Sequence, residues 1–345
     1  MLDTGLSMDA VSVVLVWTAV AVYVLAFIAY TIDLARRSDL AIKAKDAVDA
    51  RVLVGVGGAV TGGESGGAER RPDGLEVAPS ERPRYLWARI GTSLTVLGLV
   101  FHVAADVLRG IAAGRVPWSN MYEFALTGTM LVVAVYLIVL FRYDLRFLGS
   151  FVTGLAIVLL GGAALAYYVE VVPLADPLKS VWLVIHVFVA SLATAVFALA
   201  FALSVLQLMQ ARRQRLTAAA GAQADGAGDV KTGPRFLRTL PGADALESLA
   251  YRFAIVGFIL WTFTLIAGSI WANDAWGRYW GFDTKEVWTF VIWTLYAGYI
   301  HARATRGWRG TRSAWLSIIG FSAVIFNFTI VNQFFKGLHV YSGLS

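Results

Sequence analysis

The sequence predicts an all-α, polytopic membrane protein: a bundle of about eight transmembrane helices with an external tryptophan-rich loop. Composition is the first observation, because 58% of the residues are hydrophobic and only 15% are charged, far from the mixture found in soluble globular proteins. The second is a recurrence of apolar stretches close to the roughly 20 residues that cross a bilayer. The third is that basic residues collect in short runs between these stretches, as they do at cytoplasmic membrane surfaces.

The expected spans follow one another along the whole chain. They are residues 11–31, 87–107, 121–141, 147–168, 181–209, 250–271, 286–304 and 314–334. The first stretch lacks a basic leader and a small-residue cleavage site, so we expect an N-terminal transmembrane helix within residues 1–33 rather than a signal peptide.

The charged residues between the spans predict the orientation. If every span crosses the membrane, the basic clusters share one side: Arg36 and Arg37; Arg142 and Arg146; Arg212, Arg213 and Arg215; Arg303, Arg306, Arg309 and Arg312. That side is expected to be cytoplasmic, with both termini and the loop 271–288 outside a plasma or inner cell membrane. The net charge of +6 is therefore interpreted as a topology signal, and no nucleic-acid partner is expected.

Two segments on the cytoplasmic side contain few apolar residues. We expect residues 34–84, which are rich in glycine, and the loop 211–248, rich in alanine and glycine, to be flexible. The remainder, residues 85–345, is expected to form the main membrane domain. The chain has no cysteine, which excludes disulfides, thiolate metal ligands and iron–sulfur clusters within it.

Aromatic residues concentrate in the stretch WGRYWGFDTKEVW at residues 276–288. Tryptophans at a membrane surface commonly form an interfacial belt, but a belt does not explain the concentration of Trp271, Trp276, Trp280 and Trp288 around one external loop that contains Asp283 and Glu286. Carboxylates in such surroundings cost free energy unless they accept hydrogen bonds. We therefore expect them to hold the shape of the loop, with the indoles offering flat faces to a planar ligand.

The chain contains four histidines, and the expected topology places two of them together. A single histidine in an apolar helix is more often a hydrogen-bonded packing residue than a ligand. His186 and His339, however, come from distant parts of the sequence and both fall at the external face beside the tryptophans. Two neutral imidazoles can fill the axial positions of a haem iron. His301 lies about 20 Å deeper than Trp288 by helical rise, near the cytoplasmic end of its span.

Four motifs carry a family resemblance. WGRYWGFDTKEVW resembles the signature WGxxWxWDxKExW of membrane haem-handling proteins, with Phe282 where a tryptophan is usual and Thr284 where a proline is frequent. GRVPWSNMYEF at 114–124, SVWLVIHV at 180–187 and LHVYSG at 338–343 are similar to motifs of the CcsA/ResC-type component of System II cytochrome c biogenesis, in the same order. The resemblance covers residues 85–340.

The resemblance implies a membrane component of the System II cytochrome c synthase, active with a ResB-like partner. Such a protein moves haem b across the membrane and presents it at the external site for attachment to CXXCH apocytochromes c. Carried over residue by residue, His186 and His339 are the external iron ligands, and His301 is where haem enters. A second inner ligand comes from the partner. His102 matches no ligand of the family and is expected to be a packing residue.

Further ligand contacts are expected around the same loop. Trp276, Trp280, Trp288 and Asp283 belong to the predicted haem site. Arg115 and Arg278 are external despite the general charge bias, and arginines are natural partners for haem propionates. Contact with solvent or lipid phosphate is the simpler interpretation of these two residues.

Two other functions fit parts of the pattern. A haem exporter or chaperone would use the same loop without forming thioether bonds, but we would expect a smaller, roughly six-span protein. A non-haem transporter with an aromatic gate would be expected to carry a matched pair of broken helices, which the sequence does not suggest. Absorbance near the Soret band would eliminate this last alternative.

Overall fold

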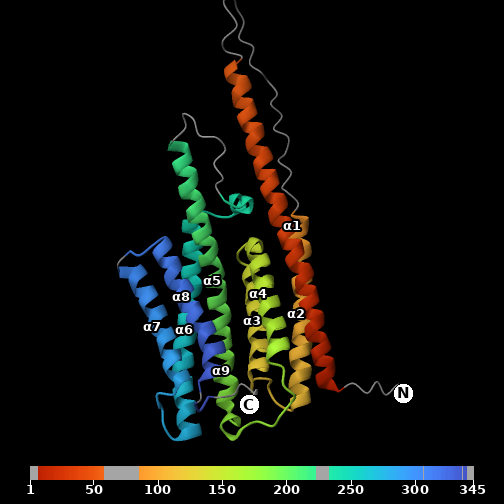
Figure 1. The fold of residues 1–345 in the computed structure, drawn as a ribbon, viewed down its shortest axis with the longest axis vertical. Helices are drawn as coiled ribbons and strands as arrows, with labels where there is room; N and C mark the ends of the chain where they lie inside the picture. Colours follow the sequence, from red (N-terminus) through yellow and green to blue (C-terminus); the bar gives the residue numbers. More distant parts are fainter. Residues whose placement is uncertain (1–6, 58–84, 223–232, 306, 336, 340–345) are drawn as a thin grey trace, which may run out of the picture.

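The computed structural model describes residues 7–57, 85–222, 233–305, 307–335 and 337–339, and all regular elements in these ranges are helical (Figure 1). The α-helices are α1 (Met8–Gly57), α2 (Leu86–Ala113), α3 (Met121–Leu140), α4 (Gly149–Ala166), α5 (Val181–Ala222), α6 (Ala243–Trp276), α7 (Thr284–Thr305), α8 (Thr311–Phe326) and α9 (Asn332–Phe334). Short 3-10 helices occupy Arg146–Leu148, Asp176–Leu178 and Arg235–Thr239, and a π-helical turn, Asn327–Val331, joins α8 to α9. The predicted all-α class is confirmed.

Within the described residues, seven helices are long and apolar enough to cross a membrane, counting α8 with its continuation as one. The chain is therefore a multi-pass membrane protein. The helix missing from the seven is α7, for which the sequence predicted a span over 286–304. It forms a helix of 22 residues, but it carries Lys285, Glu286, Arg303 and several threonines, so its composition is more polar than that of the others.

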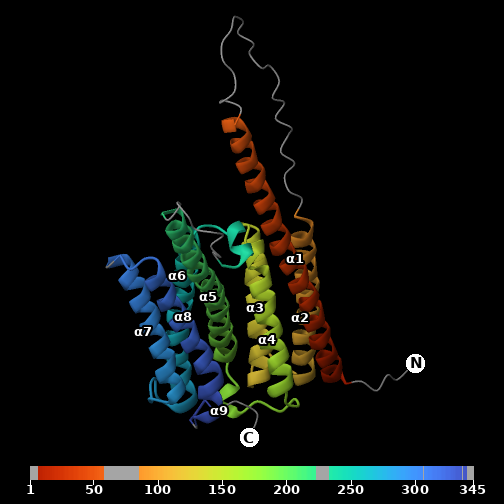
Figure 2. The same cartoon turned by 45° about the horizontal axis from the view of Figure 1, so that its top comes forward.

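The helices form two groups that lie side by side. α1 packs along α2 and α4, whereas α5 packs against α6 and α8, and α7 lies on α8. The contact between α3 and α5 joins the groups, as both views of the bundle show (Figures 1 and 2). The largest hydrophobic cluster surrounds α5; in it, the rings of Phe197 and Tyr296 stack with centroids 3.7 Å apart.

One end of the bundle gathers the connections that matter for the site. The α2–α3, α4–α5 and α6–α7 connections and the end of α9 lie together at the lower end of Figure 1, with the start of α1. We call this the loop end. Helices that alternate in direction place these connections on one side, as the sequence predicted for the tryptophan-rich loop and the C-terminal tail.

Parts of the two segments that composition assigned to flexible regions are helical. α1 continues to Gly57 and α5 to Ala222, so residues 34–57 and 211–222 extend their helices. The extensions are rich in alanine, leucine, lysine and arginine, which are good helix formers. Asp33 pairs with Arg37 one turn later in α1. Asp33 also ties α1 to α2, because it accepts a hydrogen bond from the backbone N–H of Ala88 at 3.1 Å. Residues 58–84 and 223–232 lie outside the described residues.

Candidate functional site

A cavity of about 480 Å³ opens at the loop end, between α3, α4, α5, α6, α7 and the π-helical turn. Most of its lining is aliphatic or aromatic. Its described tryptophans are Trp118, Trp261, Trp271, Trp276 and Trp280. A few polar side chains converge on this apolar space, among them His186, His339 and Lys285. The size and the combination of an apolar wall with few polar groups are those of a small-molecule or cofactor site.

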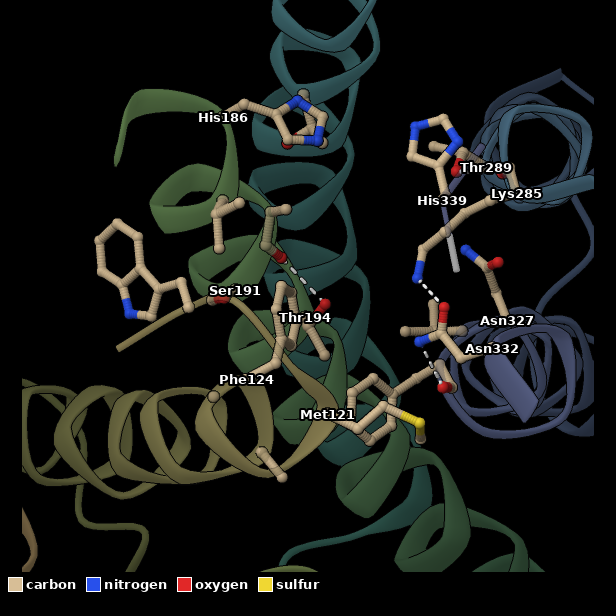
Figure 3. Close-up of a pocket in the computed structure, with 18 of the residues that line it drawn as sticks. Met121, Phe124, His186, Ser191, Thr194, Lys285, Thr289, Asn327, Asn332 and His339 are labelled. Atoms are coloured by element: carbon tan, nitrogen blue, oxygen red, sulfur yellow. Dashed lines mark hydrogen bonds between the residues drawn. The ribbon is translucent and has the colours of Figure 1, made fainter. Parts of the chain in front are cut away.

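His186 and His339 face this cavity from opposite sides (Figure 3). His186 comes from the start of α5, and its ring meets Trp271 edge-on with centroids 5.5 Å apart. Its Nδ1 is buried and makes no hydrogen bond of good geometry. The ring rests on Gly268 of α6, where an added Cβ would lie 2.7 Å from Cε1 and 3.0 Å from Nδ1. A glycine at this position therefore lets the imidazole lie against the α6 backbone.

His339 is oriented by a carboxylate. Its Nδ1 lies 2.7 Å from Oδ2 of Asp283, and Oδ1 of Asp283 accepts the backbone N–H of Leu338 at 2.9 Å. Burial alone would raise the pKa of Asp283, but the hydrogen bonds from His339 and Leu338 lower it overall. Burial lowers the pKa of His339 against the opposing effect of Asp283. The pair thus favours an ionised carboxylate beside a neutral imidazole, the arrangement that orients metal-ligating histidines.

The loop between α6 and α7 is closed by its own hydrogen bonds. Glu286 binds Nη1 of Arg278 at 2.9 Å and the backbone N–H groups of Gly281 and Asp283 at 2.8 and 3.2 Å. Gly277 ends α6 in the left-handed conformation with φ 68°. Both acidic residues therefore hold the shape of the loop, as expected from the sequence. Phe282 also adopts a left-handed φ of 57° and is 79% exposed; it is not part of the cavity lining, and its ring meets that of Trp280 edge-on.

The structure divides the predicted tryptophans. Trp276 and Trp280 line the cavity, and Trp276 meets the ring of His339 edge-on at 4.9 Å. Trp288 instead packs against Phe326 of α8, with ring centroids 4.4 Å apart, and is not in the cavity wall. Trp271, which the sequence places in the same concentration of tryptophans, also lines the cavity, whereas Trp118 and Trp261 are wall residues that the sequence did not assign to the site. Trp118 belongs to the motif PWSNMYEF, which is the signal that identifies it.

The two predicted arginines are outside the cavity wall. Arg278 is bound to Glu286 within the loop. Arg115 contacts both carboxylate oxygens of Glu123, at 2.7 and 3.3 Å. Glu123 also pairs with the fully buried Arg109, which binds Asp9 of α1 at 2.6 Å. Arg115 therefore belongs to a buried ion cluster that links α1, α2 and α3 beside the site.

The other two histidines lie elsewhere. His102 is fully buried between α1, α2 and α3, with Nε2 2.9 Å from the Leu126 carbonyl oxygen and Nδ1 3.3 Å from the Tyr23 hydroxyl. This buried, hydrogen-bonded position is that of a packing residue, as the sequence predicted. His301 is exposed near the far end of α7, about 20 Å from Trp288 by helical rise. It does not line the cavity.

Lys285 is a cavity residue that sequence reasoning did not assign. Its Nζ donates a hydrogen bond to Oδ1 of Asn332, whose Nδ2 donates to the Phe328 carbonyl at 2.8 Å (Figure 3). Asn327, five residues before Asn332, also lines the cavity, and its Oδ1 is buried without a hydrogen-bond partner. Asn327 is the first residue of the π-helical turn, and Asn332 follows its last residue. Such a turn often occurs at functional sites.

Residues 118–339, which include every described residue of the cavity wall, match the family described as cytochrome C assembly protein. The chain belongs to the cytochrome c assembly protein family. Two curated relatives indicate which type of cytochrome c assembly protein this chain resembles. Cytochrome c biogenesis protein CcsA of Guillardia theta is 33% identical over 265 residues, which are 74% of this chain and 86% of that protein. CcsA of Synechococcus elongatus is 33% identical over 282 residues, 73% of this chain and 87% of that protein.

A solved structure shares the fold of this family member. The cytochrome c heme lyase CcmF superposes with a TM-score of 0.59 at 13% sequence identity, over 94% of this chain. The chain spans about half the length of that protein, since 47% of it is covered. At this level of identity the likeness concerns the fold alone. The resemblance to a CcsA-type cytochrome c biogenesis protein found in the sequence motifs is therefore confirmed by family and by relatives.

Proposed function

We propose that this chain is the membrane component of a System II cytochrome c synthase. In this role it moves haem across the cell membrane and presents it at the external cavity for covalent attachment to CXXCH apocytochromes c. The observation that carries the proposal is the cavity shared by His186 and His339. Two imidazoles from sequence positions 153 residues apart (339 − 186) face one aromatic-walled space. Two such donors suit haem iron, because the porphyrin supplies the other four ligands.

The reaction would depend on positioning more than on acid–base chemistry. Each cysteine thiol of the apocytochrome adds across one haem vinyl group: the S–H bond breaks, a C–S bond forms, and the hydrogen goes to the other vinyl carbon. The addition is balanced without an oxidant or a leaving group. The aromatic walls and the two histidines would hold haem in register for this step. One histidine must then give way to the histidine of the CXXCH motif.

The proposal includes a second site at the other end of α7. His301 is proposed to receive haem near the cytoplasmic face, together with a ligand from a ResB-like partner. Its distance from the tryptophan-rich loop, about 20 Å along α7, means that one haem could not contact both regions at once. Haem would therefore occupy the two sites in sequence.

The test is maturation of a reporter cytochrome c in cells that express the chain with its partner. His186→Ala and His339→Ala should abolish attachment, and added imidazole should partly restore it by filling the vacant axial position. His102→Ala should mature the reporter nearly normally. His301→Ala should lower the haem content of the purified complex, measured by pyridine haemochrome spectra. If the His102 variant were as inactive as the other two, the assignment of ligands would be wrong.

A further inference from the structure

The ammonium group of Lys285 lies in the cavity and, among the described residues, forms no ion pair, although Glu286 lines the same cavity and Asp283 lies close enough to attract the charge. Among the described residues that line the cavity, Lys285 is the only lysine or arginine. Its one hydrogen-bond partner there, Asn332, is a neutral amide. A lysine ammonium has three donors, so this contact uses one of them and neutralises none of the charge. A charge held away from water is costly unless an opposite charge pairs with it.

The nearby carboxylates are committed to other groups. The Asp283 carboxylate forms hydrogen bonds with the His339 ring and the backbone N–H of Leu338. It also accepts a hydrogen bond from the backbone N–H of Lys285 at 3.4 Å, but none from the Lys285 ammonium. Glu286 is taken by Arg278 and by two backbone N–H groups. Within the part of the chain that the structure describes, neither carboxylate forms an ion pair with Lys285. The cavity therefore presents an ammonium group that forms no ion pair with the described carboxylates, because both are hydrogen-bonded to other groups.

The arginines that sequence analysis favoured are bound in the opposite way. Arg115 and Arg278 each pair with a carboxylate of the protein, at 2.7 and 2.9 Å, and neither lines the cavity. Moving either guanidinium to a ligand would break an existing ion pair, whereas Lys285 has donors to spare. Asn327 adds a second polar group on the same wall, and turning its amide by 180° would aim the NH2 group where its unpartnered Oδ1 now lies.

We propose that the Lys285 ammonium binds a carboxylate of the ligand in this cavity. On the function proposed above, on which this inference rests, the carboxylate is a haem propionate. The vinyl groups and the propionates occupy opposite edges of haem. Anchoring the propionate edge beside Asn332 would turn the vinyl edge toward the rest of the cavity. Lys285 is thus a positioning residue that determines which edge of the substrate meets the thiols.

The experiment compares haem with haem dimethyl ester, which keeps the iron and the vinyl groups but has no carboxylates. Both are titrated into the purified full-length protein in detergent, and the Soret band gives the two dissociation constants. Four proteins are used: wild type, Lys285→Met, Lys285→Arg, and the control Lys179→Met, which removes an exposed lysine paired with Asp176 on the α4–α5 connection. The ratio of the two constants gives the preference of each protein for haem, and comparing this ratio between the four proteins cancels the difference in solubility between the ligands, which is the same for all of them.

We expect wild type to bind haem about 10- to 100-fold more tightly than the ester, the range of a charge-assisted hydrogen bond. Lys285→Met should lose this preference by weakening haem binding alone, while Lys285→Arg and Lys179→Met keep it. Equal affinities of wild type for haem and the ester would overturn the inference and leave the haem site intact. A wild-type protein that binds neither ligand would overturn the proposed function and the inference together. The wild-type comparison needs no variant to fold.

Discussion

Gly268→Ala is the smallest change that should displace a proposed haem ligand. Gly268 lies in α6 directly under the ring of His186, and a Cβ built there would come within 2.7 Å of Cε1. Ordinary carbon–carbon contacts are about 3.5–4.0 Å, so the ring would have to move by about 1 Å. The α6 backbone cannot yield by this amount without disturbing its own packing against α5. The displacement therefore falls on the imidazole.

A shift of this size is large compared with what a metal ligand tolerates. Distances at metal sites are held within about 0.2 Å, so the imidazole nitrogen would move several times further than that. Misplacement of a reacting group by about 1 Å can lower a rate by about 100-fold. We expect cytochrome c attachment to fall by about this factor, although both histidines are still present.

The assay is the spectrum of the haem-loaded protein together with reporter maturation. Gly268→Ala should convert low-spin, bis-histidine haem toward a high-spin form. The control is Gly128→Ala in α3, a glycine that also lines the cavity but has no atom within 4 Å of an added Cβ. It adds the same methyl group to the wall without touching His186. If Gly268→Ala matched Gly128→Ala in spectrum and maturation, His186 would not be an axial ligand in the position described.

Two further predictions concern carboxylates. Asp283→Asn removes the charged acceptor of His339 and Leu338 and should weaken haem binding about 10- to 100-fold, as measured by Soret titration. The control Asp176→Asn, at an exposed position, should leave haem affinity unchanged. An unchanged haem affinity of the Asp283 variant would show that this carboxylate does not orient His339. Glu247→Gln leaves the largely buried Arg303 without its countercharge and should lower the free energy of unfolding in detergent by about 3 kcal/mol. The control is Asp144→Asn, which breaks an exposed ion pair with Arg146 and should lower the free energy of unfolding by less than about 1 kcal/mol. Equal effects of the two variants would contradict the buried role of Glu247.

The fold class and the pair of cavity histidines followed from the sequence because both depend on the order of spans. Apolar length predicted the helices, and alternating direction predicted that His186 and His339 share one end. Helix length beyond the apolar region was less predictable. Residues 34–57 read as polar and glycine-containing, whereas contacts such as Asp33 with Ala88 support a helix there. Such contacts join residues 55 positions apart (88 − 33) and leave no local pattern.

The walls of the cavity depend on which face of each helix turns inward, and composition alone does not determine this. Lys285 and Thr289, four residues apart on α7, line the cavity, while Trp288 lies on the face that meets Phe326 of α8. Nothing in the sequence separated Trp288 from Trp276 and Trp280, all three of which were predicted to belong to the site. Similarly, the sequence places Lys285 between Asp283 and Glu286, which suggests a local ion pair, yet in the folded loop these carboxylates accept hydrogen bonds from His339 and Arg278. That the Lys285 ammonium pairs with neither of these carboxylates is evident only from the three-dimensional arrangement.

The π-helical turn Asn327–Val331 sets the rotational phase of α9, which follows it directly. In an α-helix, side chains five residues apart point about 140° away from each other, whereas the widened turn brings both Asn327 and Asn332 to the cavity. Deleting one residue here would restore a regular α-helix and rotate α9 by about 100°. Asn332 would turn away from the cavity and from the Lys285 ammonium, although neither residue had changed. The contact between Asn332 and Lys285 thus rests on a single extra residue in the last long helix.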